Sequence, residues 1–119
     1  MSTRTAVQLA TRVMRKQNWV DALHSPSAAD SSYIVGVYEA KLAEWADRDD
    51  LTIYWTADTT PLAIFEPLAD LLINQVAETY EPKGRTPEQI QESEEVLLGP
   101  IRRHIQKRGS GLPTQVDYF

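Results

Sequence analysis

With 119 residues, 42% of them hydrophobic, and a net charge of −5 at pH 7, the chain suits a single domain with one modest core. It contains no cysteine, which excludes disulfides, thiolate nucleophiles and cysteine metal sites and agrees with a reducing compartment. Because neither a signal-peptide core nor an apolar run of bilayer length is present, we expect a soluble protein.

A first helix is predicted over residues 5–16 from the spacing of its apolar residues. Ser2 or Thr3 is the expected N-cap, because a small hydroxyl side chain can accept a hydrogen bond from the first free backbone N–H groups. The segment is amphipathic, so one side is expected to face a core. The apolar stripe consists of Val7, Ala10, Val13 and Met14, with Leu9 at its margin.

A second helix is predicted over residues 28–46. Ser27 is followed three residues later by Asp30, which is close to a capping box and favours a helix that begins directly after Ser27. The apolar positions keep helical spacing, and they include Tyr38 and Trp45 on the stripe expected to be buried. A run of charged residues then ends the helix.

The segment Leu51 to Trp55 (L-T-I-Y-W) is short, β-branched and aromatic, which favours an extended backbone. No adjacent run carries hairpin signals that would pair with it. We therefore predict an extended connector whose aromatic residues pack beneath a helix. Strand addition to a neighbouring copy is the alternative.

The third helix, predicted over residues 61–80, is the most hydrophobic element. Thr59 or Thr60 is the expected cap and Pro61 the expected first helical residue. Pro67 should kink the helix or split off a short first piece, because proline lacks an N–H and its ring clashes with the preceding turn. The expected centre of the core consists of Leu68, Leu71, Leu72 and Val76.

A fourth helix is predicted over residues 87–107. The run T-P-E-Q from Thr86 to Gln89 combines a cap, a first-position proline and a capping-box glutamine. Gly99-Pro100 interrupts the pattern, but apolar residues keep nearly one face across the break, so one kinked helix is expected. Glu94 and Glu95 belong to a charge run of the kind that usually marks a solvated face.

These elements predict an all-α fold, a small bundle of about four helices with an extended connector and an extended C-terminal tail. The helical domain is expected over residues 1–108 and the tail over residues 109–119. Apolar residues at the end of a glycine-containing segment need a groove on the same chain or on a partner, and docking on a partner is favoured. The expected docking residues are Leu112, Val116, Tyr118 and Phe119.

Charge is segregated along the chain, with basic ends and an acidic middle. Sixteen of the seventeen acidic residues lie within residues 19–97. Such segregation lets unlike regions of neighbouring copies attract, or lets a basic rim face DNA. The alternative is two solvated helix faces that compensate the helix dipoles. The candidate residues facing DNA or a partner are Arg12, Arg15, Lys16, Arg102, Arg103, Lys107 and Arg108.

The sequence carries no pattern of residues typical of catalysis. His24 and His104 are the only histidines, and they do not have metal-ligand spacing. No serine lies in a nucleophile elbow, and the five glycines form no phosphate-binding loop. We therefore expect no enzymatic activity, no catalytic residue, no cofactor and no metal, and we expect His104 to contact neighbouring polar groups.

Four features in a fixed order carry a resemblance to a known family. They are A-T-R-V-M-R-K (Ala10 to Lys16), K-L-A-E-W (Lys41 to Trp45), the third helix entered through Pro61, and a basic helix end that leads to G-L-P-T (Gly111 to Thr114). Over nearly the whole chain, they resemble the helical head-to-tail adaptors of tailed phages. The chain is similar in this respect to the packaged-DNA stabilisation, or tail accessory, proteins of short-tailed phages.

The resemblance implies a structural virion protein of the phage neck. It implies a homo-oligomeric ring, a dodecamer, that binds beneath the portal, retains packaged DNA and forms the platform for tail assembly. The implied partners are other copies of the chain, the portal protein, and tail, nozzle or stopper proteins. Non-specific contact with packaged DNA is also implied, whereas contact with a membrane is not. During assembly such a protein would be in the host cytoplasm.

The alternative to this resemblance is a small helical DNA-binding or regulatory protein. Its basic first helix, or the segment from Arg102 to Arg108, would then contact phosphates. The net negative charge and the lack of helix-turn-helix spacing make this alternative weaker.

Overall fold

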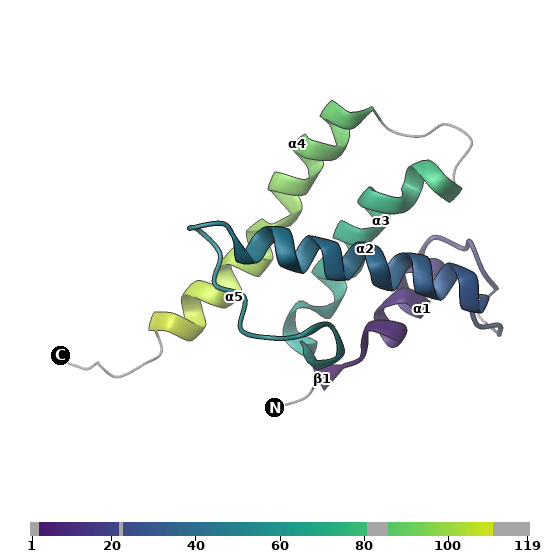
Figure 1. The fold of residues 1–119 in the computed structure, drawn as a ribbon, viewed down its shortest axis with the longest axis horizontal. Helices are drawn as coiled ribbons and strands as arrows, with labels where there is room; N and C mark the ends of the chain where they lie inside the picture. The colour runs from purple at the N-terminus through teal and green to yellow at the C-terminus, as the bar shows by residue number, and fades with distance from the viewer. Residues whose placement is uncertain (1–2, 22, 81–85, 111–119) are drawn as a thin grey trace.

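Residues 3–21, 23–80 and 86–110 are described by the computed structural model, and most of them are helical (Figure 1). The predicted all-α fold is confirmed, with the addition of a two-stranded antiparallel sheet. The segment from residue 111 onward, which contains the predicted docking residues, lies outside the described residues. In chain order the elements are β1 (Thr3–Arg4), α1 (Ala6–Lys16), α2 (Ala28–Ala46), η1 (Ala57–Thr59), β2 (Thr60–Pro61), η2 (Leu62–Ile64), α3 (Phe65–Tyr80), α4 (Pro87–Leu97) and α5 (Gly99–Ser110).

Helix α3 is the centre of the bundle and contacts α1, α2, α4 and α5. Figure 1 shows α2 crossing in front of α3, with α1 on one flank of α3 and α4 on the other. The side chains of Leu68, Leu71, Leu72 and Val76 are fully buried, which confirms the predicted centre of the core. Within the described part of the chain, no helix is both long and apolar enough to cross a bilayer.

The N-cap of helix α1 lies later in the chain than predicted. Thr5, and neither Ser2 nor Thr3, is the N-cap, and it forms a capping box with Gln8. The cause is the sheet, because Thr3 and Arg4 pair with Pro61 and Thr60 in β2 and so take extended backbone. The predicted stripe is also rotated, since Val7 is 55% exposed. The buried residues of α1 are Ala6, Leu9, Ala10, Val13 and Met14.

Helix α2 begins at the predicted position, and Ser27 is its N-cap, accepting a hydrogen bond from the backbone N–H of Asp30. Both aromatic residues expected in the core, Tyr38 and Trp45, are buried. The buried tyrosine hydroxyl accepts a hydrogen bond from Trp55 Nε1 at 3.0 Å. Burial of that tryptophan confirms that the connector after α2 packs an aromatic residue beneath a helix.

The entry into α3 differs from the prediction. Thr60 and Pro61 form β2 instead of a cap and a first helical residue, and the α-helix begins only at Phe65 after the 3₁₀ turn η2. Pro67 explains the split, because in a continuous α-helix its ring would clash with the carbonyl of Ala63. The proline lies instead in the first turn of α3, where no intrahelical N–H donor is needed.

Helix α4 begins with the predicted capping box between Thr86 and Gln89. The expected single kinked helix is found as two helices, α4 and α5, joined at Leu98. The backbone of Leu98 stays helical, with φ −73° and ψ −15°, but Pro100 cannot donate to the carbonyl four residues earlier. Helix α5 continues to Ser110 and so enters the segment predicted as tail.

Candidate functional site

Two of the predicted basic residues on α1 bind carboxylates of α3. Arg12 makes two hydrogen bonds of 2.8 Å to the two carboxylate oxygens of Glu66. Lys16 Nζ lies 3.1 Å from Glu66 Oε1 and 2.7 Å from Asp70 Oδ1. The hydrogen bonds from Arg12 and then Lys16 lower the pKa of Glu66 to about 2. These cations therefore hold α1 against α3 as intramolecular partners.

The outer side of α1, next to the pair of Arg12 and Glu66, is basic and partly apolar. Arg15 lies on it and donates two hydrogen bonds, of 3.2 and 3.0 Å, to the backbone carbonyl of His24. Val7 lies on the same face, 55% exposed. A hollow of about 360 Å³ opens there, and we call it the α1 hollow. It is lined by Arg4, Val7, Gln8, Thr11, Arg12, Arg15 and Phe65.

Arg102 belongs to a four-residue ion-pair network where α4 meets α5. Its Nη2 atom lies 2.8 Å from Asp50 Oδ2 and 3.0 Å from Glu95 Oε2. Arg48 contacts the same two carboxylates, at 2.9 and 3.0 Å. The hydrogen bond from Arg102, followed by that from Arg48, lowers the pKa of Glu95. The network ties the chain after α2 to the joint between α4 and α5.

The other predicted basic residues of α5 are Arg103, Lys107 and Arg108. Arg103 and Lys107 are exposed, and the side chain of Arg108 lies outside the described part of the structure. Figure 1 shows α1 and α5 well apart on the molecule. Of the basic residues singled out from the sequence, the six whose side chains are described are therefore divided between α1 and α5.

A buried charge pair was missed by sequence reasoning. Glu94 is only 8% exposed, which makes its assignment to a solvated face wrong. Its Oε1 atom accepts hydrogen bonds from Lys41 Nζ at 2.7 Å and from Gln75 Nε2 at 2.6 Å. Burial lowers the pKa of Lys41, but its hydrogen bonds to Glu94 and Glu44 outweigh this effect and leave that pKa raised. The pair joins α2, α3 and α4.

A sequence signal for this pair did exist. Glu94 lies between Ile90 and Leu97 on the apolar stripe of α4, four residues after one and three before the other. An acid on such a stripe needs a buried cation or hydrogen-bond donor, because an unpaired buried carboxylate is costly. The identity of the donors could not be read from the stripe, because they come from α2 and α3.

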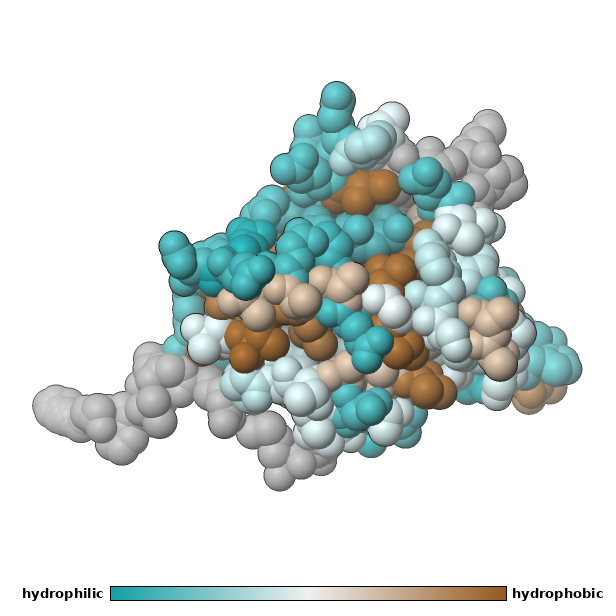
Figure 2. Space-filling view, viewed as in Figure 1, coloured by the Kyte–Doolittle hydropathy of each residue, from teal (hydrophilic) through white to brown (hydrophobic). Residues whose placement is uncertain are grey.

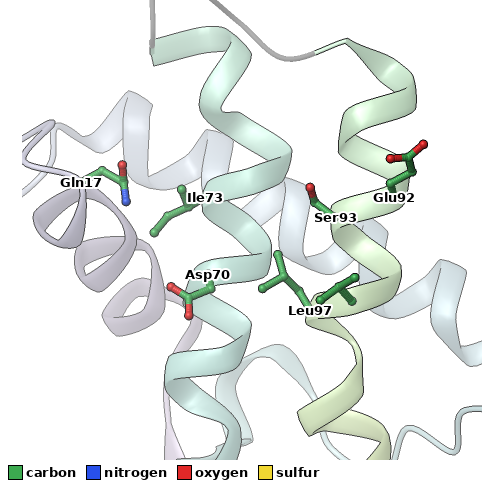
Figure 3. Close-up of a pocket in the computed structure, with 7 residues that line it drawn as sticks. Gln17, Asp70, Ile73, Glu92, Ser93 and Leu97 are labelled. Carbon is green, nitrogen blue, oxygen red and sulfur yellow. The ribbon is translucent and has the colours of Figure 1, made fainter.

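An open groove of about 580 Å³ lies between α1, α3 and α4 (Figure 3). Ile73 and Leu97 give it an apolar lining, and Gln17, Asp70, Glu92 and Ser93 contribute polar groups. Val96 also lines the groove and is 76% exposed. On the α2 side of the molecule, Figure 2 shows hydrophobic surface in separate patches between hydrophilic residues.

The two histidines lie in different surroundings. His104 Nε2 is 2.6 Å from the hydroxyl of Tyr54, and the two rings stack, so His104 contacts a polar neighbour as expected. His24 is exposed near Asp21, with 3.7 Å between Nδ1 and Oδ2. Among the described residues, no group of three or more histidine, aspartate or glutamate side chains is arranged to hold a metal ion.

The described residues form charged and partly apolar surfaces on packed helices. The basic face of α1 and the outer face of α4, which carries Glu88 and Glu92, have opposite charge. The predicted docking residues Leu112, Val116, Tyr118 and Phe119 lie outside the described residues. Comparisons of the chain with family models, with curated proteins and with solved structures found no match.

Proposed function

We propose that the chain is a structural head-to-tail connector, or adaptor, of a tailed phage. Copies of it form a ring beneath the portal in the virion neck, retain the packaged DNA and provide the platform for tail attachment. The proposal comes from the resemblance of the segments Ala10 to Lys16, Lys41 to Trp45 and the helix after Pro61 to such adaptors.

The observation that carries the proposal is that the resembling segments supply contacts between helices. In the first segment, Val13 and Met14 enter the core while Arg12 binds Glu66 on α3. In the second, Trp45 is fully buried and Lys41 reaches Glu94 on α4. Proteins with the same arrangement of helices need similar residues at the contacts between those helices. The position of the resembling segments at such contacts therefore supports the proposed resemblance to the adaptors.

The DNA-binding alternative receives less support from the same side chains. Binding to phosphates requires cations that can replace counterions along the duplex. Arg12, Lys16 and Arg102 already contact carboxylates of their own chain, so DNA would have to displace those partners. The paired cations are better suited to holding the helices together than to reading a duplex.

Measurement of native mass tests the proposal. The 13.5 kDa chain is mixed with the isolated portal ring of the same phage, and the mass gained by the ring is determined by native mass spectrometry. We expect a uniform complex with about twelve added copies, because the resemblance implies a dodecamer and a closed ring adds a fixed number of copies. Absence of portal binding at micromolar concentration would overturn the proposal. Tight, salt-sensitive binding to duplex DNA without portal binding would favour the alternative.

A further inference from the structure

Two helix faces of opposite charge, partly exposed on α1 and exposed on α4, lie on opposite flanks of α3 (Figure 1). On α1, Val7, Thr11 and Arg15 follow one another at intervals of four residues and all line the α1 hollow. On α4, Glu88 and Glu92 are followed at the same interval by Val96. Residues four apart lie in one row along a helix, so each face is a row about 12 Å long.

The two rows are complementary when the helices run in opposite directions. Val7 at the start of one row then meets Val96 at the end of the other, and Arg15 meets Glu88. Val7 and Val96 are 55% and 76% exposed, so their contact would remove two apolar side chains from water. The charged ends would form an ion pair between unlike faces.

The shapes of the two faces also fit. Val96 lines the groove between α1, α3 and α4 and is 76% exposed, whereas the α1 hollow next to Val7 is a depression of about 360 Å³ with Phe65 in its lining. An exposed valine on one face and a partly apolar hollow on the other suit a contact in which the valine enters the hollow.

We propose that α1 of one copy packs antiparallel against α4 of a second copy, with Val96 seated in the α1 hollow and Arg15 paired with Glu88. The two surfaces differ, so the contact is head-to-tail, and a joined pair of copies keeps one unused α1 face and one unused α4 face. Repetition of such a contact produces a ring where the rotation closes. The inference rests on the proposed ring function and names the surfaces between its subunits.

Cysteine pairing tests the contact directly, because the native chain has no cysteine. Val7→Cys and Val96→Cys are introduced together, and the protein is oxidised mildly under conditions in which it assembles, with portal ring added where needed. We expect a ladder of disulfide-linked oligomers on non-reducing gels, because the proposed register brings the two positions within disulfide distance. Each single variant should remain unlinked, since the contact is between unlike faces.

The matched control pairs Val7→Cys with Leu23→Cys, which is 90% exposed and lies outside both rows. A ladder no stronger than this control, in a preparation that assembles, would overturn the interface while leaving the adaptor function standing. A strong ladder without any binding to the portal would support the interface and overturn the adaptor function. Disulfide dimers from a single variant would indicate a symmetric contact and would also refute the inference.

Charge reversal gives an independent test. Arg15→Glu should weaken self-association roughly tenfold or more, because it places like charges opposite each other. Glu88→Arg should do the same, and the two changes combined in one chain should restore most of the association. Glu39→Arg, at an exposed position of α2 outside both rows, serves as the control and should change association little. Failure of the combined variant to recover would overturn the proposed register.

Discussion

The buried pair between Lys41 and Glu94 makes a sharp prediction about stability. Lys41→Met keeps most of the side-chain volume but removes the cation 2.7 Å from the carboxylate. Glu94 would then keep the hydrogen bond from Gln75 in a site where only 8% of the residue is exposed. Breaking one partner of a buried pair costs about 3 to 5 kcal/mol. We expect about 3 kcal/mol, because both side chains retain some contact with water.

The free energy of unfolding is measured by urea denaturation, with the slope of the transition as a check that the unfolded state is unchanged. The double variant Lys41→Met and Glu94→Met should recover most of the loss and lie within about 1 kcal/mol of the wild type, because no unpaired charge remains. Glu44→Gln is the matched control. It removes the charge of the other partner of Lys41. The side chain of Glu44 is 57% exposed, so this change should cost less than about 1 kcal/mol.

Two results would refute this reasoning. A loss below about 1 kcal/mol for Lys41→Met would mean that water reaches Glu94 and replaces the cation. A double variant as unstable as the single variant would mean that the lysine contributes through its packing and not through its charge.

Four further predictions concern the core, a helix cap, acid stability and the tail. Leu72→Ala should lower the free energy of unfolding by roughly 2 to 5 kcal/mol, because Leu72 is fully buried. A loss below about half a kcal/mol would mean that α3 does not belong to the core. Thr5→Ala should cost about 1 kcal/mol by loss of the α1 cap, measured by the same denaturation; an unchanged midpoint would refute the capping box. The pKa of Glu66, about 2 in the folded chain, lies below its ordinary value of 4.5, so its contribution is present above pH 4.5 and is lost as the pH falls toward 2. Wild type should therefore lose more stability over that range than Glu66→Gln, and parallel losses in a pH series of urea titrations would contradict this. Deletion of residues 112–119 should leave the thermal midpoint nearly unchanged while weakening ring or portal association in native mass measurements. Unfolding of the shortened chain would mean that the tail stabilises the helical domain of the same chain.

Local patterns predicted the helices well because their signals span only one turn. Ser27 and the capping box from Thr86 to Gln89 each bind backbone N–H groups within three residues. They therefore mark the starts of α2 and α4 independently of the rest of the fold. The split before α3 was also foreseen, since the effect of Pro67 on the preceding turn is local. The buried leucines of α3 follow from helical periodicity in the most hydrophobic segment.

The errors involve partners far away in the sequence. The cap of α1 moved to Thr5 because Thr3 and Arg4 pair with residues about 57 positions later, and such a short ladder leaves no periodic signal in either segment. The exposure of Val7 follows from the side on which α2 and α3 cover α1. A hydrophobic stripe indicates that a helix has a buried side. It locates the centre of that side only to within about one residue position around the helix.

By itself, the sequence determined the all-α class, the starts of α2 and α4, and the residues at the centre of α3, because each depends on contacts within a few positions of the chain. Only the tertiary structure decided how the charges are used. It paired Arg12, Lys16 and Arg102 with carboxylates of other elements, buried Glu94 against Lys41, and left Arg15 and Glu88 on separate outer faces. A charged residue is compatible with solvent, an ion pair or an interface, and the choice among them depends on which distant segment the fold brings next to it.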